Sequence, residues 1–466
     1  MLQLREMEIS NRSYQIARDG DSSWLMTVSR GLASALGRNV YPLRFSIVVV
    51  ESREATVEST VVRFDERDRH AQSFRSVEIF HPRKKSLQVR PFIAAQIIPT
   101  GVRCEFGGFA GDAAPVTNLI ASAVDYLVTH PNAINASELN EMAPNVLYVE
   151  GKSLDDFLLG RVGLVPTVAN KIGTFIDPTG TRYIDDVINA LNAARAVKGI
   201  DCGLYTVLPR GPGVHIEWSG AGCAVGTILE PGNILNAVGL LFEHGAQAIG
   251  GVSVIEDVTS AMFAQHIEGQ IPNPSGGVEA IITHLISKVF RLPTAHAPLP
   301  YHQDVKEKST HNPRAAAEFI SMPHYFSVLK GLAQAPRLIE IDPAGQVPPA
   351  AFSVDNVHAI VVPASCLGGI PALAAEFHDI PLIAVRENTT ILDVTNAKMG
   401  MRNVVEVDSY LEATGVLLAL RQGISLESVR RPLGRAVCVS SKAPDTAAVA
   451  RLVDAQEGVR FRSGMR

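Results

Sequence analysis

Residues 357–388 read VHAIVVPASCLGGIPALAAEFHDIPLIAVREN. Two short apolar runs, each suited to a strand, enclose a stretch rich in alanine and leucine, so the segment predicts a compact strand–helix–strand unit. Strands joined through a helix pair in parallel, because a parallel connection has to cross the sheet. This stretch therefore predicts a parallel sheet with helices packed against it.

The same alternation extends back to about residue 93. Other strand candidates also end in polar or small residues: DYLVTHP (125–131), NVLYVE (145–150), KIGTFID (171–177), GLYTVL (203–208) and AQAIGGVSVI (246–255). Between them lie amphipathic helices, two of which stop at Gly199 and Gly245, where a left-handed C-terminal residue is expected. The predicted fold class is α/β, with a mainly parallel sheet that carries helices on both faces.

The N-terminal region differs from the rest. LRFSIVVVES (43–52) and ATVESTVVRF (55–64) read as an antiparallel hairpin, so residues 1–92 are predicted to form a small β-rich domain. Prolines and small residues cluster near 345–356 and suggest a further boundary. We therefore expect an α/β core domain at 93–345, a second α/β unit at 346–435 that completes the site, and a C-terminal tail at 436–466.

Composition narrows the class of protein. A net charge of −5 gives no reason to expect binding to nucleic acid or to an anionic membrane. Charged residues interrupt the first fifteen positions, where a signal peptide needs an apolar run, and no window resembles a membrane span. The five cysteines are scattered and unpaired in spacing, which predicts a reduced, cytoplasmic protein. The sequence does not decide the oligomeric state, and a homo-oligomer is one of the states it allows.

Ligands of parallel α/β sheets gather at the carboxyl ends of the strands, so polar residues at strand ends are candidates for a site. GGFAGDAAPV (107–116) places Gly108, Gly111 and Asp112 before a helix. Glycine amides there would cradle an anionic or polar ligand, and Asp112 would bind it or act as a base. The alternative is a glycine turn with an aspartate N-cap.

THPNAIN (129–135) follows an apolar strand directly. His130 is a candidate acid–base residue, and Thr129, Asn132 and Asn135 are candidate substrate-binding residues. An asparagine-rich turn would explain the asparagines alone, but not the threonine and histidine that precede them.

Two further segments are weaker candidates. SGAGCAVG (219–226) offers Ser219 and Gly222 in a glycine-rich loop that an ordinary turn would also explain. PTAHAPLP (293–300) holds His296 between prolines, which would fix its direction. No HxH or HExxH spacing occurs, so the sequence does not decide whether a metal binds, and it names no cofactor.

The ends of the two strands quoted first complete the set. Ser365, Cys366 and Gly368 precede a helix, whose N-terminus would lower the pKa of the thiol and make Cys366 a nucleophile. A small buried hydrophobic residue is the alternative for this cysteine. After the next strand, Glu387 would act as a base or clamp, with Asn388 and Thr390 as substrate-binding residues.

In this order, GGFAGDAAPV, THPNAINASEL, NVLYVEG, SGAGCAVGTILEP, GVEAIITHLISKVFRLPTAHAP, IVVPASCLGG and RENTTILDV resemble an uncharacterised bacterial family found in cyanobacteria and actinobacteria, a domain of unknown function. The resemblance covers about residues 96–430 and does not extend to the first ninety. It implies one conserved type of core and assigns no chemistry.

Three functions fit these observations. The first is an enzyme, a lyase or hydrolase that acts on a small carboxylate- or nitrogen-bearing metabolite. In it His130 and His296 exchange protons, Asp112 or Glu387 orients them, and loop amides hold a developing anion. The second is a small-ligand-binding or sensor protein without turnover. The third is a scaffold protein in which the glycine loops are only turns.

Overall fold

The computed structural model describes most of the chain. The described residues are 7–18, 22–52, 54–64, 74, 82–85, 90–135, 141–299, 312–317, 325–341 and 346–436. Residues 1–422 form one compact unit and residues 423–466 another. Within the second unit, the described residues contain a short 3-10 helix, η6 (Leu426–Val429). The predicted tail at 436–466 lies outside the described residues except for Ala436.

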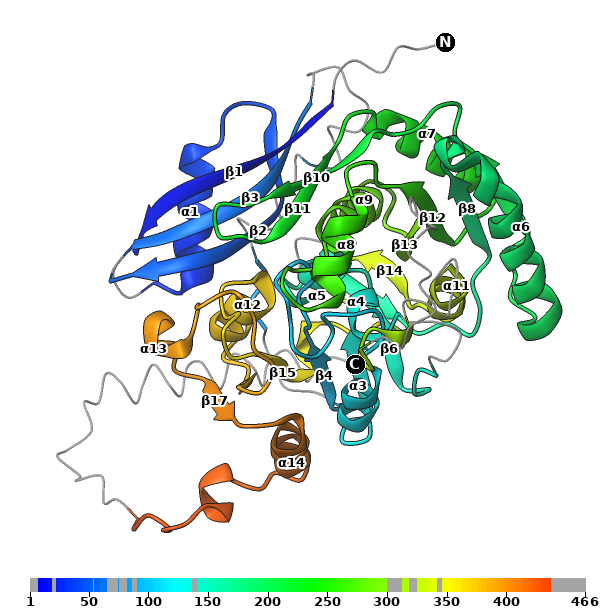
Figure 1. Cartoon of the computed structure of the whole chain (residues 1–466). Coiled ribbons are helices and arrows are strands. Elements are labelled where there is room, and N and C mark those ends of the chain that lie inside the picture. Colours follow the sequence, from blue (N-terminus) through cyan, green and yellow to red (C-terminus); the bar gives the residue numbers. More distant parts are fainter. Residues whose placement is uncertain are drawn as a thin grey trace. The chain divides into compact units, whose positions relative to one another are not determined.

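A six-stranded sheet organises the first unit, and every neighbouring pair of its strands is parallel (Figure 1). In spatial order the strands are β17 (Val404–Val407), β16 (Leu382–Val385), β15 (Val357–Pro363), β4 (Ile93–Gln96), β5 (Tyr126–Thr129) and β6 (Val146–Tyr148). The chain runs outward from β4 through β5 to β6, then resumes at β15 on the other side of β4. This is the order of a doubly wound sheet, and its direction reverses between β4 and β15.

Helices cover both faces of this sheet, as the sequence predicts. On one face α3 contacts α14, and on the other α5 contacts α12. Neighbouring residues of β4 show the two-sided burial, because Ala94 packs in the same core as Leu417 of α14 while Ala95 packs in the same core as Leu373 of α12. The helices are α3 (Ala114–Ala121), α4 (Pro131–Ile134), α5 (Gly151–Leu158), α12 (Ile370–His378), α13 (Asn396–Met399) and α14 (Tyr410–Arg421).

The strand–helix–strand unit predicted at 357–388 is confirmed as β15, α12 and β16. Pro371 lies in the first turn of α12, where a missing N–H costs nothing. The helix ends at Asp379, which adopts a left-handed conformation with φ 57°. The fold class predicted from this stretch is therefore confirmed.

A second parallel sheet is inserted between β6 and β15. Its strands, in order, are β13 (Thr294–Leu299), β12 (Ala248–Val254), β8 (Ile172–Ile176) and β9 (Leu204–Val207). The inserted helices, together with η5 just before β15, are η3 (Pro178–Tyr183), α6 (Ile184–Ala193), η4 (Ala194–Lys198), α7 (Pro231–Glu243), α8 (Ser260–Ile267), α9 (Gly276–Phe290), α11 (Tyr325–Ala333) and η5 (Val354–Asn356). Gly199 and Gly245 have φ values of 68° and 87°, which confirms the two predicted helix ends.

Two antiparallel ribbons accompany this sheet. One pairs β10 (Val214–Trp218) with β11 (Ala224–Ile228), and the other pairs β7 (Val162–Val165) with β14 (Arg337–Glu340). No helix among the described residues is long and apolar enough to cross a membrane.

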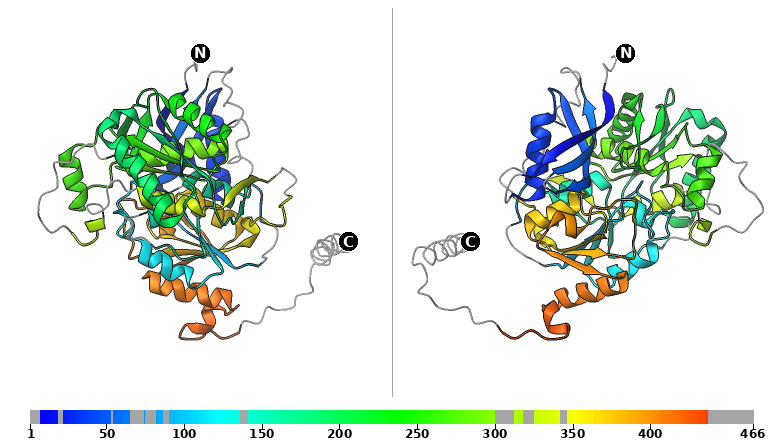
Figure 2. Two further views of the ribbon diagram at one scale, coloured as in Figure 1. Left: turned by 90° about the vertical axis from the view of Figure 1, so that its right-hand side faces the viewer. Right: turned by 60° about the vertical axis from the view of Figure 1, so that its left-hand side comes forward.

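The N-terminal hairpin is confirmed as β2 (Val40–Glu51) and β3 (Glu54–Arg63). Two further elements, β1 (Glu8–Ala17) and α1 (Trp24–Ala35), complete a three-stranded antiparallel sheet of order β1-β3-β2 with one helix. We call β1, α1, β2 and β3 the N-terminal sheet. It lies beside α12, which α1 contacts, and beside β11, which β1 contacts (Figure 2).

The predicted domain boundaries stay predictions. The strands on either side of the proposed boundary at 345 belong to one sheet, because β15 pairs with β4. The N-terminal sheet likewise lies within the same compact unit as the rest of residues 1–422.

Candidate functional site

A cavity of about 390 Å³ lies at the carboxyl ends of β4, β5, β6 and β15. This is the point at which the strand order reverses, where doubly wound sheets bind their ligands. The N-terminal sheet, β13 and the helices α5, α8, α9, α11 and α12 also contribute residues to its walls. The six-stranded sheet, the inserted four-stranded sheet and the N-terminal sheet therefore all contribute to the cavity.

Glu150 and His284 form a buried pair on the cavity wall. Glu150 follows β6 and caps α5, since one carboxylate oxygen accepts a hydrogen bond of 3.0 Å from Ser153 N–H. The other oxygen accepts from Thr283 Oγ1 at 3.1 Å and contacts Nδ1 of His284. Burial alone would raise the pKa of Glu150, but the adjacent His284 ring and these hydrogen bonds hold it below its ordinary value.

This pairing gives His284 a defined chemical role. A carboxylate at Nδ1 holds the proton on that nitrogen, so Nε2 carries the lone pair when the ring is neutral. No protein group within the described residues hydrogen-bonds Nε2. His284 lines the cavity with its side chain 12% exposed, which leaves Nε2 available to a ligand.

Asp155 lies on α5 and also lines the cavity. Its carboxyl group makes no hydrogen bond or ion pair with any described residue. Burial raises its pKa to about 8; nearby Lys152 and Arg44 oppose the rise, while Asp156 and Glu150 add to it. Asp155 is therefore mainly a neutral carboxylic acid at pH 7, able to donate a proton.

The next residue of α5 anchors the helix to α9. Asp156 is fully buried and pairs with Lys152 and with Arg291, whose Nη1 lies 2.6 Å from the carboxylate. Burial would raise the pKa of Asp156, but Lys152, Lys288 and Arg291 hold it far below its ordinary value. This ion network fixes the two helices that carry Glu150 and His284.

His130 follows β5 and lines the same cavity. Its Nε2 accepts a hydrogen bond of 2.9 Å from Ile98 N–H, so the neutral ring carries its proton on Nδ1. Burial lowers its pKa to about 4, while Glu150 raises it and His284 lowers it further. At pH 7 His130 is a neutral donor and not a base.

Arg44 of β2 and Glu58 of β3 line the cavity from the N-terminal sheet. Glu58 accepts a hydrogen bond of 3.1 Å from Ala221 N–H. The Arg44 guanidinium has no hydrogen-bond or ion-pair partner among the described residues. Burial lowers the pKa of Arg44, against the attraction of Cys223, Glu58 and Asp155.

His296 belongs to β13 and lines the cavity, but both its nitrogens are occupied. Nδ1 lies 3.2 Å from a carboxylate oxygen of Glu279, and Nε2 lies 2.8 Å from Ser253 Oγ. Serine, histidine and carboxylate in a row resemble a nucleophilic triad. Ser253, however, is fully buried and does not line the cavity, so its hydroxyl holds His296 in place and cannot attack a ligand.

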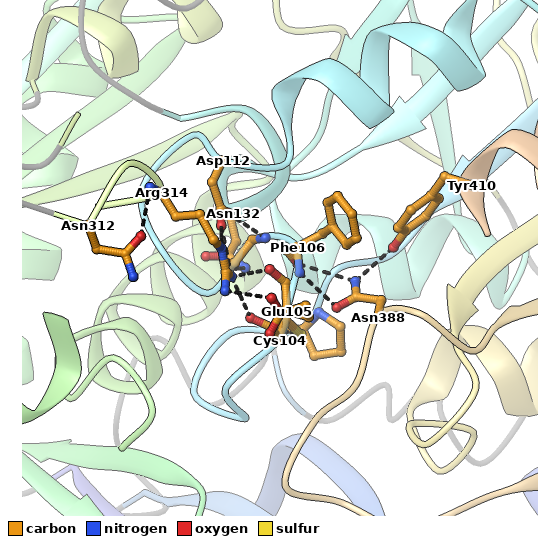
Figure 3. Close-up of polar contacts among 11 residues, drawn as sticks. Cys104, Glu105, Phe106, Asp112, Asn132, Asn312, Arg314, Asn388 and Tyr410 are labelled. Atoms are coloured by element: carbon orange, nitrogen blue, oxygen red, sulfur yellow. Dashed lines mark hydrogen bonds and ion pairs between the residues drawn. The ribbon is translucent and has the colours of Figure 1, made fainter. Parts of the chain in front are cut away.

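The glycine loop after β4 is held together by Arg314 (Figure 3). Asp112 accepts from Gly107 N–H at 2.5 Å and from Arg314 Nε at 3.0 Å, and it does not line the cavity. Burial raises the pKa of Asp112 to about 6, and the ion pair with Arg314 opposes that rise. Gly111 has φ 77°, as a tight turn requires, and Gly108 lines the cavity.

The THPNAIN residues divide between cavity and scaffold. Asn132 and Asn135 line the cavity, although Asn132 donates to Ile98 O and Gly107 O, and Asn135 Oδ1 accepts from Tyr148 OH. Thr129 is buried outside it and donates to Gln96 O.

The loop between β10 and β11 is a turn at the edge of the cavity. Ser219 Oγ accepts from Cys223 N–H at 3.1 Å, and Gly222 has the left-handed φ of 80°. Neither residue lines the cavity, whereas Cys223 does.

Cys366 lines the cavity but lacks the properties of a nucleophile. Burial raises the pKa of its thiol to about 11, the opposite of the lowered pKa that a helix N-terminus was expected to give. The helix begins only at Ile370, so no helix end lies at the sulfur. Thr390 Oγ1 lies 3.3 Å from the Cys366 sulfur and 2.8 Å from Ser365 Oγ, outside the cavity lining.

Gly368 serves the packing of the N-terminal sheet. A Cβ atom there would lie 1.9 Å from the carbonyl oxygen of Ile47 in β2. In turn, Ile47 N–H donates to Gly368 O at 2.9 Å. Gly368, which was predicted to bind substrate, instead lets β2 pack closely against the segment between β15 and α12.

Glu387 and Asn388 lie outside the cavity lining. Glu387 is exposed and accepts from Tyr410 N–H at 2.6 Å, at the start of α14. Asn388 is buried and bonds to the backbone of Phe106 and to Tyr410 OH, which ties the glycine loop to α14 (Figure 3).

The cavity thus brings together some predicted residues and omits others. Those that line it are Gly108, His130, Asn132, Asn135, His296 and Cys366. The prediction missed Arg44, Glu58, Glu150, Asp155, Glu279 and His284, which also line it. Only Glu150 carried a usable signal, since it ends the strand candidate NVLYVE in the same manner as the chosen residues.

No group of three or more histidine, cysteine, aspartate or glutamate residues within the described part of the chain is arranged to hold a metal ion. The titratable residues of the cavity are instead engaged as pairs or are single. The chemistry that this arrangement can perform is proton transfer.

The protein is thus a doubly wound α/β protein with a cavity at the point where the strand order of its sheet reverses. Residues 93–430 match the family model described as a protein of unknown function (DUF3326), and the chain belongs to that family. It is 33% identical over 341 residues to an uncharacterised lipoprotein of Synechococcus sp., an alignment that covers 72% of this chain and 92% of the relative. No solved structure matches the chain.

These comparisons confirm the resemblance seen in the sequence. They also correct one prediction, because the sequence led us to expect a cytoplasmic protein and the Synechococcus relative is named a lipoprotein. The expectation relied on the scattered positions of the five cysteines, and these positions do not distinguish a cytoplasmic protein from a lipoprotein.

Proposed function

We propose that the protein is an enzyme of the lyase or hydrolase type that acts on a small carboxylate- or nitrogen-bearing metabolite by acid–base chemistry. One observation carries the proposal: a protonated carboxyl group and an imidazole with an unengaged nitrogen line the same cavity. Asp155 keeps its proton because its pKa is about 8, and His284 offers Nε2 because Glu150 engages Nδ1. A protonated carboxyl group and an imidazole nitrogen in one cavity are the groups that acid–base catalysis uses.

The proton steps are as follows. His284 Nε2 removes a proton from a substrate carbon or from an attacking water, and Glu150 stabilises the resulting imidazolium. Asp155 donates its proton to the leaving oxygen or nitrogen. The Nδ1–H of His130 donates a hydrogen bond to the charge that develops on the substrate. Release of the proton from His284 and uptake of one by Asp155 restore the starting state.

The experiment is a turnover screen with matched variants. Purified protein is incubated with small hydroxy acids, amino acids and amides, and product is followed by proton NMR. Wild type is expected to convert at least one compound, and His284→Asn and Asp155→Asn are expected to abolish that conversion. His215→Asn is the control, because His215 pairs with Asp257 at 2.8 Å in the same manner but does not line the cavity.

The alternative is a small-ligand-binding or sensor protein that uses the same cavity without turnover. Its supporting observation is that the donors Arg44 and His130 are able to hold a ligand in the absence of any reaction. Saturable binding of a panel compound that remains chemically unchanged, with His284→Asn and wild type alike, would favour this alternative over the enzyme.

A further inference from the structure

Arg44 is the one cationic side chain that the N-terminal sheet contributes to the cavity lining. Its residue is only partly exposed, and its guanidinium finds no hydrogen-bond or ion-pair partner among the described residues. A guanidinium carries five N–H donors in a planar fork, and donors left without acceptors in a partly desolvated place are costly. The geometry that satisfies the fork best is a carboxylate or phosphate bound through two oxygens.

We propose that Arg44 binds an anionic group, a carboxylate or a phosphate, of the molecule that occupies the cavity. The N-terminal sheet thereby selects the charge of the substrate. This inference deepens the proposed function and rests on it for the word substrate, but the anion site itself does not depend on turnover.

None of the acidic residues that line the cavity forms an ion pair with Arg44. Glu58 attracts Arg44 but remains beyond ion-pair distance; its Oε1 accepts from Ala221 N–H, and its Oε2 is buried without a hydrogen-bond partner among the described residues. Glu150 is engaged by His284, and Glu279 by His296. Asp155, which also lies near Arg44, is mainly uncharged at pH 7.

Arg44 lies in a part of the chain that the family model does not match, since the match begins at residue 93. The β2 strand that carries Arg44 is nevertheless built into the cavity wall, because Ile47 N–H donates to Gly368 O and Gly368 leaves no room for a side chain. The matched segment of this chain carries Asp155 and His284, and the N-terminal sheet carries Arg44.

The test measures the binding of four small probes: acetate, succinate, inorganic phosphate and the neutral acetamide. Line broadening of the probe signals, proton for the organic probes and phosphorus for phosphate, gives each dissociation constant. We expect anions, and not acetamide, to bind the wild-type chain. Arg44→Met should weaken anion binding about ten- to hundred-fold, the factor expected for charge-assisted hydrogen bonds. The relative affinities of succinate and phosphate distinguish the two sources of anion.

Two further variants control the result. Arg63→Met removes the same charge from the same sheet at an exposed position and should leave binding unchanged. Arg44→Lys keeps the charge but loses the fork, so binding should fall between wild type and Arg44→Met, and this variant decides the matter if Arg44→Met does not fold. Equal binding by wild type and the Arg44 variants, equal binding of acetamide, or no anion binding by wild type overturns the inference.

The outcomes separate this inference from the proposed function. Anion binding that depends on Arg44, without turnover of any compound, retains the anion site and rejects the enzyme. Turnover that depends on His284 and Asp155, with anion binding unchanged in Arg44→Met, retains the enzyme and rejects the anion site.

Discussion

The glycine loop after β4 and the cavity face of α5 both follow strands of the same sheet, yet they treat their polar groups differently. In the loop, both oxygens of Asp112 accept hydrogen bonds, one from Gly107 N–H and one from Arg314. On α5, the carboxyl group of Asp155 has no partner among the described residues, and its pKa is raised to about 8. A polar residue at a strand end thus marks a site only when its neighbours leave it unsatisfied.

The largest expected effect concerns the cavity side of this comparison. Replacing Asp155 by asparagine keeps the shape of the side chain but removes the proton that it donates. Turnover of a substrate found in the NMR screen should fall by roughly 10²- to 10⁴-fold, the range for loss of a general acid. Initial rates at pH 7 measure this. A rate within two-fold of wild type, as we expect for Asp201→Asn outside the cavity lining, would remove Asp155 from the mechanism.

Helix α5 carries Asp155 and Asp156, and loss of the Asp156 ion pairs should lower the stability of the protein. Asp156→Asn removes a fully buried carboxylate that pairs with both Lys152 and Arg291, so the free energy of unfolding should fall by about 3–5 kcal/mol. Urea unfolding followed by circular dichroism gives the value. The matched control is Asp185→Asn, because Asp185 is exposed in the first turn of α6. Similar losses for both variants would contradict a role for the ion network.

The pH dependence of stability sharpens the same comparison. Asp155 has a folded pKa of about 8 against an ordinary value of 3.8, so the folded protein holds an extra proton between these pH values. The stability that this group contributes is complete below about pH 4 and is lost as the pH rises to about 8. The stability of wild type relative to Asp155→Asn should therefore decline by at least about 1 kcal/mol over this window. If the difference in stability between wild type and Asp155→Asn is the same at pH 5 and at pH 8, Asp155 is not desolvated in the folded protein.

On the loop side, Arg314→Met should affect stability and leave chemistry intact. It removes the donors to Asp112 and to the backbone of the loop, and we expect a loss of about 1–2 kcal/mol. Turnover should remain within a few-fold of wild type, because neither residue lines the cavity. A collapse of turnover without loss of stability would mean that the loop takes part in the reaction.

The smallest effect is expected for Cys366→Ala. The thiol is buried and has a pKa near 11, so it is almost wholly protonated at pH 7 and a poor nucleophile. Turnover should be unchanged, and stability should fall by about 1 kcal/mol or less. Complete loss of turnover in a folded protein would restore covalent catalysis through this residue.

Much of the fold could be predicted because its signals are local. Apolar runs suited to strands alternate with amphipathic helices, and the glycines at 199 and 245 end helices through their own backbone conformation. The prediction missed strand β1 and helix α1. Strand β1 was missed because it is largely polar along its exposed positions. The strand order, which brings β15 beside β4, is decided by long-range packing that no short segment encodes.

The site was only partly predictable for the same reason. His130 and Cys366 follow strands that meet at one edge, and the rule for parallel sheets finds such residues. His284 lies within α9 and Arg44 within a hairpin, where neither spacing nor residue type signals a cavity. Asp112 and Glu387 obey the rule but are bound by Arg314 and by the start of α14, contacts that only the folded chain reveals.

The pairing of β4 with β15 also bears on how the chain is synthesised. Residues 97 to 356 lie between the two strands, and β4 has no neighbour on that side until β15 has left the ribosome. At about 5–20 residues per second this interval lasts tens of seconds. During that time β4 offers the unpaired edge of an apolar strand, which is a template for association with other chains. Newly made protein should therefore depend on chaperones more than its finished stability would suggest.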